Sequence, residues 1–284
     1  MNANPDISVV VLTHNRREAL RNTLRHLCAL PERVPIAVAD NASSDGTAEM
    51  LRADFPSVTH LRSEVNAGAA GRNLGAAWAS TRHVAFCDDD CWWAAGSLAR
   101  ACALFDMHPR IGALTARVVV GAQEREDPAS TLMGNSPLPS ADLPGHAILG
   151  LMAGATAFRT EAFLQAGGYD ARFFVGGEET LLALDLVTHG WHLVYTPDLT
   201  VHHCPSPLRD ASGRRQLLAR NAIWAAWLRL PMTMAWRITA ARLPQIWREQ
   251  GRTGVADTLR GMGWVLRERR VVPRHVARAV ALIS

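Results

Sequence analysis

The sequence contains no lysine, and all 30 of its basic side chains are arginine. A guanidinium group binds a phosphate or a carboxylate through paired hydrogen bonds, a geometry that an ammonium group cannot match. Codon usage explains such a bias without any functional cause, so the missing lysine does not by itself assign a partner. The arginines are also spread along the chain. Nucleic-acid binding, which favours a clustered basic patch, is therefore not expected.

Cysteine pairs and long apolar runs are missing as well. The five cysteines include no CxxC pair, which argues against a zinc ribbon and against a disulfide framework. No uninterrupted apolar run reaches the ~18 residues that a membrane-spanning helix needs. Residues 1–6 are polar and lack the charged and apolar regions of a signal peptide. We therefore expect a cytoplasmic protein with reduced thiols.

Alternating strand and helix patterns fill the first third of the 284 residues. Short apolar runs predict the strands, and apolar side chains at helical spacing predict the helices between them. The predicted strands are residues 7–12, 34–39, 58–61 and 83–87, and the predicted helices are residues 16–30, 68–79 and one that opens at 47–51. This order predicts an α/β fold with a mostly parallel central sheet flanked by helices, and a ligand site at the carboxyl edge of that sheet.

The rest of the chain is less regular. Helices are predicted at residues 96–108, 161–166 and 178–189, strands at 111–120 and 147–158, and extended chain up to 203. Residues 121–145 are polar and rich in proline, which predicts a loop that covers a site. From residue 213 the pattern is helical, with many Arg and Trp. We therefore expect an α/β domain at residues 1–212 and a C-terminal helical extension at residues 213–284.

Three adjacent aspartates are the strongest candidate for a site. Asp88, Asp89 and Asp90 directly follow the strand predicted at residues 83–87. Adjacent carboxylates repel one another unless a cation or solvent offsets the charge. Carboxylates are also the oxygen ligands that Mg²⁺ and Mn²⁺ prefer. Taken alone, this feature fits either a metal site or a solvated acidic turn.

Two further segments place polar groups at the same edge of the sheet. Asp40 ends the second strand, where its carboxylate can accept hydrogen bonds from a base or ribose, although Asp is also typical of turns and helix N-caps. The glycines of residues 66–75, NAGAAGRNLG, permit close approach of the backbone to a ligand, and Arg72 would then face a diphosphate. Alternatively, this segment starts a helix packed on the sheet. This segment is neither GxGxxG nor a P-loop, so dinucleotide and triphosphate sites are not predicted.

These segments occur in an order typical of one enzyme family. The sequence resembles the inverting family 2 glycosyltransferases, which have the GT-A fold, the nucleotide-diphospho-sugar transferase fold. The resemblance spans residues 7–203, and its segments are VVVLTHNR (9–16), ADNASSDGT (39–47), NAGAAGRNLG (66–75), FCDDDCWW (86–93), GGYD (167–170), GGEETLLALDL (176–186) and VHH (201–203). It implies that residues 1–212 form a GT-A catalytic domain.

The resemblance also implies roles for individual residues. Nucleotide-sugar binding is implied for Thr13, Asn15, Asp40, Arg72, Asp88 and Asp89. Asp90 is implied to bind Mg²⁺ or Mn²⁺ as part of a DXD motif, with His203 beside it. For His203, a structural histidine is the other interpretation, and the neighbouring His202 is an alternative candidate.

The catalytic base is implied by a pair of acidic residues. In the family, the base is the second residue of a Glu-Asp pair before a helix. This sequence has Glu178-Glu179, so Glu179 is the candidate base and Glu178 is the alternative. The implied reaction is hexosyl transfer from a UDP- or dTDP-sugar to an acceptor hydroxyl with inversion, in cell-surface glycan biosynthesis. The acceptor is a glycan, a lipid-linked molecule or a small molecule.

Two other functions remain open. A sugar nucleotidyltransferase also uses carboxylates and a metal, but such enzymes usually carry a glycine-rich N-terminal loop, and residues 9–16 contain no glycine. A catalytically inactive sugar-nucleotide-binding protein is the second, and only the Glu-for-Asp departure at Glu179 supports it.

The C-terminal helices allow two interpretations. An Arg- and Trp-rich amphipathic helix can lie in a membrane interface, which would place the protein on the inner face of the membrane. Alternatively, the helices pack on the catalytic domain or form a homodimer interface.

Overall fold

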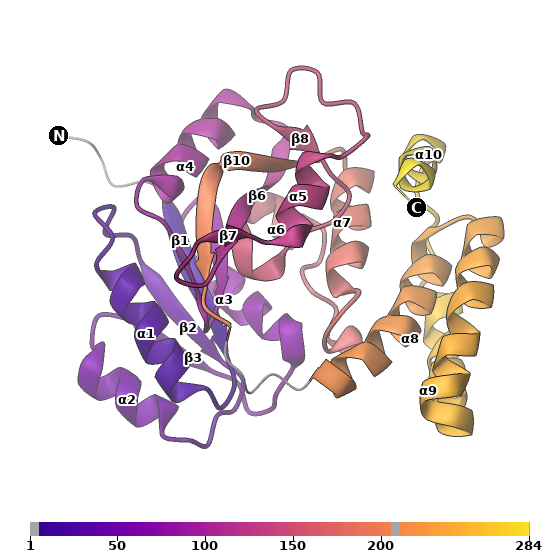
Figure 1. The fold of residues 1–284 in the computed structure, drawn as a ribbon, viewed down its shortest axis with the longest axis horizontal. Helices are drawn as coiled ribbons and strands as arrows, with labels where there is room; N and C mark the ends of the chain where they lie inside the picture. The colour runs from indigo at the N-terminus through magenta and orange to yellow at the C-terminus, as the bar shows by residue number, and fades with distance from the viewer. Residues whose placement is uncertain (1–5, 206–210, 284) are drawn as a thin grey trace.

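The computed structural model describes residues 6–205 and 211–283. Most of the N-terminal segment 1–6, on which the expected compartment partly rests, lies outside the described residues. Figure 1 shows a sheet with helices on both faces and a further group of helices from the C-terminal end of the chain on one side.

The first part of the chain follows the predicted alternation. Its elements are β1 (Ile7–Thr13), α1 (Arg17–Cys28), β2 (Ile36–Asp40), α2 (Thr47–Asp54), β3 (Thr59–Arg62), η1 (Gly68–Gly71), α3 (Arg72–Trp78) and β4 (His83–Asp88). The strands β3, β2, β1 and β4 pair in parallel in that order. The carboxyl ends of β1, β2 and β4 therefore meet at one edge, as predicted.

The second part of the sheet is mixed. Its elements are β5 (Cys91–Trp93), α4 (Ser97–Met107), β6 (Ile111–Val120), β7 (Arg125–Glu126), α5 (Pro128–Gly134), β8 (His146–Ala147), η2 (Ala153–Ala155), β9 (Thr156–Arg159), α6 (Thr160–Gln165), η3 (Ala171–Phe173), α7 (Glu178–Thr188) and β10 (His192–His203). The strand β9 runs antiparallel to both β4 and β6, while β10 runs parallel to β6. The sheet order is β3-β2-β1-β4-β9-β6-β10-β5.

Two local predictions are corrected by the structure. Residues 147–158 do not form one strand, because β8, η2 and β9 divide this apolar stretch. Residues 121–145 are not entirely a loop, because they contain β7 and α5. Asp127 caps α5 by accepting a hydrogen bond from the Ala129 amide, and Pro128 occupies the first turn, which are ordinary signals of a helix start.

Apolar cores lie on both faces of the sheet. On one face, the strands pack against the leucines of α1 and the apolar face of α4, with Trp93 fully buried. On the other face, Phe86 and Phe158 pack with α6 and α7 around the buried Tyr169. The rings of Phe86 and Phe163 meet edge to face, with centroids 5.2 Å apart. The two cores hold the strand ends that carry the polar residues.

The C-terminal helices are α8 (Ala211–Arg229), α9 (Met232–Arg267) and α10 (Arg274–Leu282). The helix α9 is interrupted at Gly251, whose backbone has φ 61° and ψ −145°. A third apolar cluster joins these helices to the sheet domain through Phe173 and the apolar side chains of α7. The rings of Phe173 and Trp224 meet edge to face at 6.2 Å, and Arg229 pairs with Asp185 of α7.

One buried polar side chain also joins α8 to the loop that precedes α7. The amide nitrogen of Asn221 donates to the carbonyl oxygens of Phe173 at 2.8 Å, Val175 at 3.3 Å and Gly176. Gly177, which has φ 90°, packs so closely that a Cβ there would lie 2.9 Å from the Cβ of Asn221. The start of α7 is therefore set by contacts with the C-terminal helices.

The helices in the described part of the chain do not combine the length and the apolar character that crossing a bilayer requires.

His83 is a buried titratable group at the start of β4. Its ring stacks on Phe105 with centroids 4.4 Å apart, and its Nδ1 donates to the Asp6 carbonyl at 3.1 Å. Burial, reinforced by the charges of Arg159 and Arg82, lowers the pKa of His83 from 6.5 to about 4. The folded protein therefore keeps this ring neutral under conditions that protonate it in the unfolded chain.

We predict an acid-dependent loss of stability from His83. Above pH 6.5 the ring is neutral in both states, and as the pH falls toward 4 only the unfolded chain gains the proton. This group should lower the free energy of unfolding by at most about 3 kcal/mol over that range. In urea titrations, the free energy of unfolding of the His83→Phe variant should fall less steeply between pH 7 and 4.5 than that of the wild type. Parallel slopes for the two proteins would contradict this.

Candidate active site

A cleft of about 1090 Å³ lies at the edge of the sheet where β1 and β4 end. It is lined by Thr13, Arg72, Asp88, Asp89, Glu179 and His203, all of which the sequence predicts as site residues. Asp90 lies beside this lining and contacts His203. The structure thus brings together side chains that are far apart in the sequence.

The middle carboxylate of the aspartate run is buried among polar contacts. Asp89 accepts a hydrogen bond from the Thr13 hydroxyl at 2.9 Å and pairs with the Arg16 guanidinium at 2.7 Å. Burial raises the pKa of Asp89 to about 7, because the stabilising charge of Arg16 does not offset the loss of water and the charges of Asp88 and Asp90. Asp89 therefore supports the turn between β4 and β5 from within the protein.

Arg16 connects two of the three aspartates, a contact that was not predicted from the sequence. Its second nitrogen lies 3.0 Å from the Asp90 carboxylate, so one guanidinium bridges Asp89 and Asp90. The sequence did contain a signal for it, because a run of aspartates in a buried turn requires a cation nearby. Arg16 closes the VVVLTHNR segment, in the short connection between β1 and α1, where such a cation would be expected.

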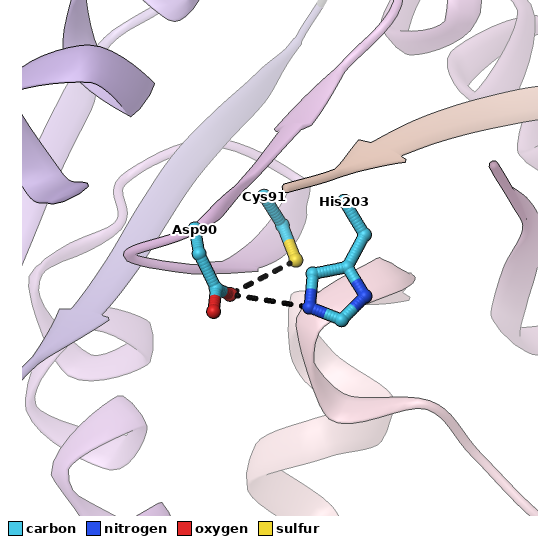
Figure 2. A group of neighbouring side chains, drawn as sticks. All are labelled: Asp90, Cys91 and His203. Carbon is cyan, nitrogen blue, oxygen red and sulfur yellow. Dashed lines mark hydrogen bonds and ion pairs between the residues drawn. The ribbon is translucent and has the colours of Figure 1, made fainter. Parts of the chain in front are cut away.

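Asp90 faces His203 across the edge of the sheet. The short strand β5 follows Asp90 and pairs antiparallel with the end of β10, which places Cys91 opposite His203. Figure 2 shows the three side chains, with the Nε2 of His203 at 3.6 Å and the Sγ of Cys91 at 3.5 Å from one Asp90 oxygen. Their candidate ligand atoms all lie within 4.8 Å of one another.

The chemistry of these groups fits a divalent metal bound by Asp90 and His203. The Nε2 of His203 is buried and has no hydrogen-bond partner among the described residues, although it faces the Asp90 carboxylate. A carboxylate and an imidazole are common ligands of first-row divalent metals. Burial raises the pKa of the Cys91 thiol well above its ordinary value, so the thiol stays protonated and is a poor ligand.

The neighbouring His202 faces the other way. Side chains alternate along β10, and His202 stacks on Trp92, with centroids 5.6 Å apart. Its Nδ1 lies 3.5 Å from Glu124. Of the two histidines, the structure therefore places His203, and not His202, at the cleft.

Asp88 lies against a buried arginine and a glycine. Arg72, which is only 4% exposed, pairs with the Asp88 carboxylate, and the Arg72 guanidinium lies over the Tyr169 ring at 5.8 Å. A Cβ at Gly154 would lie 2.8 Å from the Asp88 carboxylate, so any larger residue there would have to displace this carboxylate. Gly154 belongs to η2, whose position the sequence did not predict.

Glu179 reaches the same place from α7. It lies in the first turn of this helix, where a negative charge is favoured by the helix dipole. Its Oε1 accepts a hydrogen bond from the Ala153 amide at 2.9 Å, next to the Gly154 that faces Asp88. Glu178 also lines the cleft but is more deeply buried, with 4% of its surface exposed.

Two predicted binding residues lie outside the lining of this cleft. The Asp40 carboxylate accepts hydrogen bonds from the Ser43 amide at 2.8 Å and from His60 at 3.0 Å. Burial opposes its ionisation, but these hydrogen bonds outweigh that effect and lower the pKa of Asp40. Asn15 accepts a hydrogen bond from the Ser44 amide at 2.7 Å. Their part in nucleotide binding stays a prediction.

The cleft also has lining residues that sequence reasoning did not single out. His14, Asn41, Phe174 and α5 contribute to it. Phe174 has a φ of 62°, and its carbonyl accepts a hydrogen bond from the Ala69 amide at 2.7 Å. The segment 121–145 contributes through Asp127, Ala129 and Met133, in line with the prediction that it covers a site.

We predict that Arg16 contributes measurably to stability. Removing it leaves Asp89 and Asp90 without their shared cation, and breaking a buried pair costs about 3–5 kcal/mol. Because a quarter of the Arg16 side chain is exposed, we expect Arg16→Ala to lower the free energy of unfolding by about 1–3 kcal/mol in urea titrations. The neighbouring Arg17 pairs with the exposed Glu18, so Arg17→Ala should cost less than about 1 kcal/mol. Equal losses in the two variants would contradict the prediction.

The comparisons with known proteins agree with this geometry. Residues 8–165 match glycosyl transferase family 2. The chain is 28% identical over 238 aligned residues to N-acetylglucosaminyl-diphospho-decaprenol L-rhamnosyltransferase of Mycobacterium tuberculosis, an alignment that covers 69% of this chain and 75% of the relative.

Solved structures share the fold. A mannosyltransferase from Pyrobaculum calidifontis, in complex with GDP-Man and Mn²⁺, superposes with a TM-score of 0.61 at 20% identity, over 99% of this chain and 86% of that one. GalNAc-T7 with UDP, GalNAc and Mn²⁺ has a TM-score of 0.65 at 17% identity, and 85% of this chain matches only 51% of its length. The α/β architecture is the GT-A fold, and the chain belongs to glycosyl transferase family 2, as a glycosyltransferase enzyme.

Proposed function

We propose that this enzyme transfers a sugar from a nucleoside diphosphate sugar to an acceptor hydroxyl, with inversion and with help from a divalent metal. One observation carries the proposal. The proposed base Glu179 lines one cleft with Arg72, Asp88 and the proposed metal ligand His203, and the second proposed ligand, Asp90, lies beside that lining. An inverting transfer needs these two kinds of group on either side of the sugar.

Asp90 and His203 would hold the metal, which supplies positive charge to the diphosphate as it leaves. The protein also offsets part of the carboxylate charge at this end of the cleft. The guanidinium groups of Arg16 and Arg72 pair with the aspartates before the substrate arrives, which lowers the repulsion that an incoming diphosphate meets.

Glu179 is the proposed general base. The Ala153 amide fixes the direction of its carboxylate, and its place in the cleft lets it take the proton of an attacking hydroxyl. A positioned base of this kind contributes about 10²–10⁴-fold to the rate. Asn221 supports this position, because it binds the carbonyl of Gly176 in the loop that precedes α7.

We further propose a catalytic domain at residues 1–212 and a helical extension at residues 213–284, with UDP- or dTDP-sugars as donors. The rhamnosyltransferase relative is named for a lipid-linked acceptor, which supports a lipid-linked acceptor and a role in cell-surface glycan synthesis here. Large apolar side chains that include Trp236 and Trp247 are exposed on α9. This supports contact between α9 and the inner face of the membrane.

We predict that metal binding depends on His203 but not on His202. In titrations followed by Mn²⁺ electron paramagnetic resonance with UDP or dTDP present, Asp90→Asn and His203→Gln should each weaken Mn²⁺ binding at least ~10-fold, because each removes a ligand. His202→Gln is the matched control, since His202 faces Trp92 and Glu124, and it should bind as the wild type does. Wild-type binding in His203→Gln would remove the metal assignment.

We predict that Glu179→Gln slows catalysis without weakening donor binding. The amide keeps the size of the side chain but cannot accept the proton, so kcat should fall about 10²–10⁴-fold. Calorimetry with the nucleotide should give an affinity within ~2-fold of the wild type, because the base acts on the acceptor and not on the nucleotide.

Glu178→Gln is the matched control for the base, and it should keep most of the rate. If it is the inactive variant instead, the base is Glu178. A wild-type protein that binds sugar nucleotides but neither hydrolyses nor transfers them, whatever the metal, would favour an inactive binding protein.

A further inference from the structure

A second cavity meets the proposed active site from the side of the C-terminal helices. It measures about 830 Å³ and lies between α7, α8, α9 and α10. Glu179 and Leu218 line both this groove and the cleft of about 1090 Å³ described above, which is called the donor cleft because it is the proposed site of the sugar nucleotide. The candidate base therefore faces two spaces, and the donor cleft accounts for only one of them.

The walls of the groove are apolar because of the residues that α8 and α9 place there. The helix α8 presents small side chains such as Ala222 and Ala226, which leave room between the helices. The facing side of α9 contributes Ile238 and Ala241, three residues apart and so on one helical face. A long hydrocarbon chain suits such a wall, whereas a sugar or a peptide would leave polar groups unpaired.

Two arginines add positive charge to the same groove. Arg237 and Arg242 line it from α9, next to Ile238 and Ala241. Glu179 is the acidic side chain of this lining, and Arg242 donates a long hydrogen bond of 3.4 Å to Gln245, which also lines the groove. The groove thus combines an apolar wall, guanidinium groups and one end at the base.

We propose that this groove binds the acceptor, and that the acceptor is an isoprenoid diphosphate that carries the sugar to be extended. Its hydrocarbon chain lies along the alanine wall of α8, its phosphates pair with Arg237 and Arg242, and its sugar hydroxyl reaches Glu179. This assignment rests on the proposed function, because it uses Glu179 as the base. The charge pattern and the continuity with the donor cleft select this occupant over an uncharged lipid or a second copy of the chain.

The test measures binding without donor or metal, so that it does not depend on catalysis. Calorimetry of the full chain in EDTA should show binding of farnesyl diphosphate, used as a short probe. Ala241→Trp fills the groove from its exposed rim and should weaken this binding at least ~10-fold. Ala240→Trp is the matched control, because Ala240 is an exposed neighbour on α9 that does not line the groove, and it should leave binding unchanged.

A charge reversal tests the phosphate contacts separately. The double variant Arg237→Glu and Arg242→Glu should weaken farnesyl diphosphate at least ~10-fold but leave farnesol binding unchanged. Arg252→Glu, on an exposed arginine outside the groove, should have no effect. Vesicles of phosphatidylglycerol should not displace the probe.

Several results would overturn the proposal. The first is failure of the wild type to bind farnesyl diphosphate; the others are unchanged affinity in Ala241→Trp, an equal loss of affinity in Ala240→Trp, and displacement of the probe by the vesicles. A dimer in light scattering that Ala241→Trp dissociates without weakening the probe would make the groove a subunit interface instead. If Glu179→Gln retains full transfer, the proposed base fails while these binding results stand unaffected.

Discussion

The repulsion among three adjacent carboxylates is the constraint on which this site depends. Asp88, Asp89 and Asp90 leave the end of β4 together, and two of them are almost fully buried. The protein balances them from opposite sides, with Arg72 on Asp88 and Arg16 on the other two. Burial, together with the charges of Asp88 and Asp90, still raises the pKa of Asp89 to about 7. Two guanidinium groups face three carboxylates, so a divalent cation beside Asp90 would offset the remaining negative charge, which supports the proposed metal site.

The turn at these aspartates also explains how distant segments meet. After Asp90 the chain reverses into β5, which pairs with the end of β10 and so brings His203 to the carboxylate. The 3₁₀ turn η2 contacts two further acidic residues of the cleft. Its Ala153 amide donates a hydrogen bond to Glu179, while Gly154 leaves room for the Asp88 carboxylate. Both contacts join residues that are far apart in the sequence, and the fold brings them together.

Much of this arrangement could be predicted from the sequence, and the failures have physical reasons. The parallel half of the sheet follows from apolar runs that alternate with helices, so the residues at the ends of β1 and β4 were predicted to meet. The strand β5 has only the residues Cys91–Trp93, too few for any periodicity to show. The apolar stretch 147–158 gave no sign of where β8 ends and η2 begins, because a continuous apolar run fits several structures. Arg16 and Gly154 act only through tertiary contacts, which local patterns do not contain.

The C-terminal helices contribute to the site even though they carry none of the motifs of the resemblance. The proposed role of Glu179 needs a fixed position. However, α7 begins after two glycines with positive φ, Gly176 and Gly177, which by themselves leave the loop many conformations. Asn221 removes that freedom by binding the carbonyls of this loop from α8. The same helix forms the alanine wall of the groove. One element therefore orients the proposed base and shapes the space beside it, so a change in the packing of α8 would alter both.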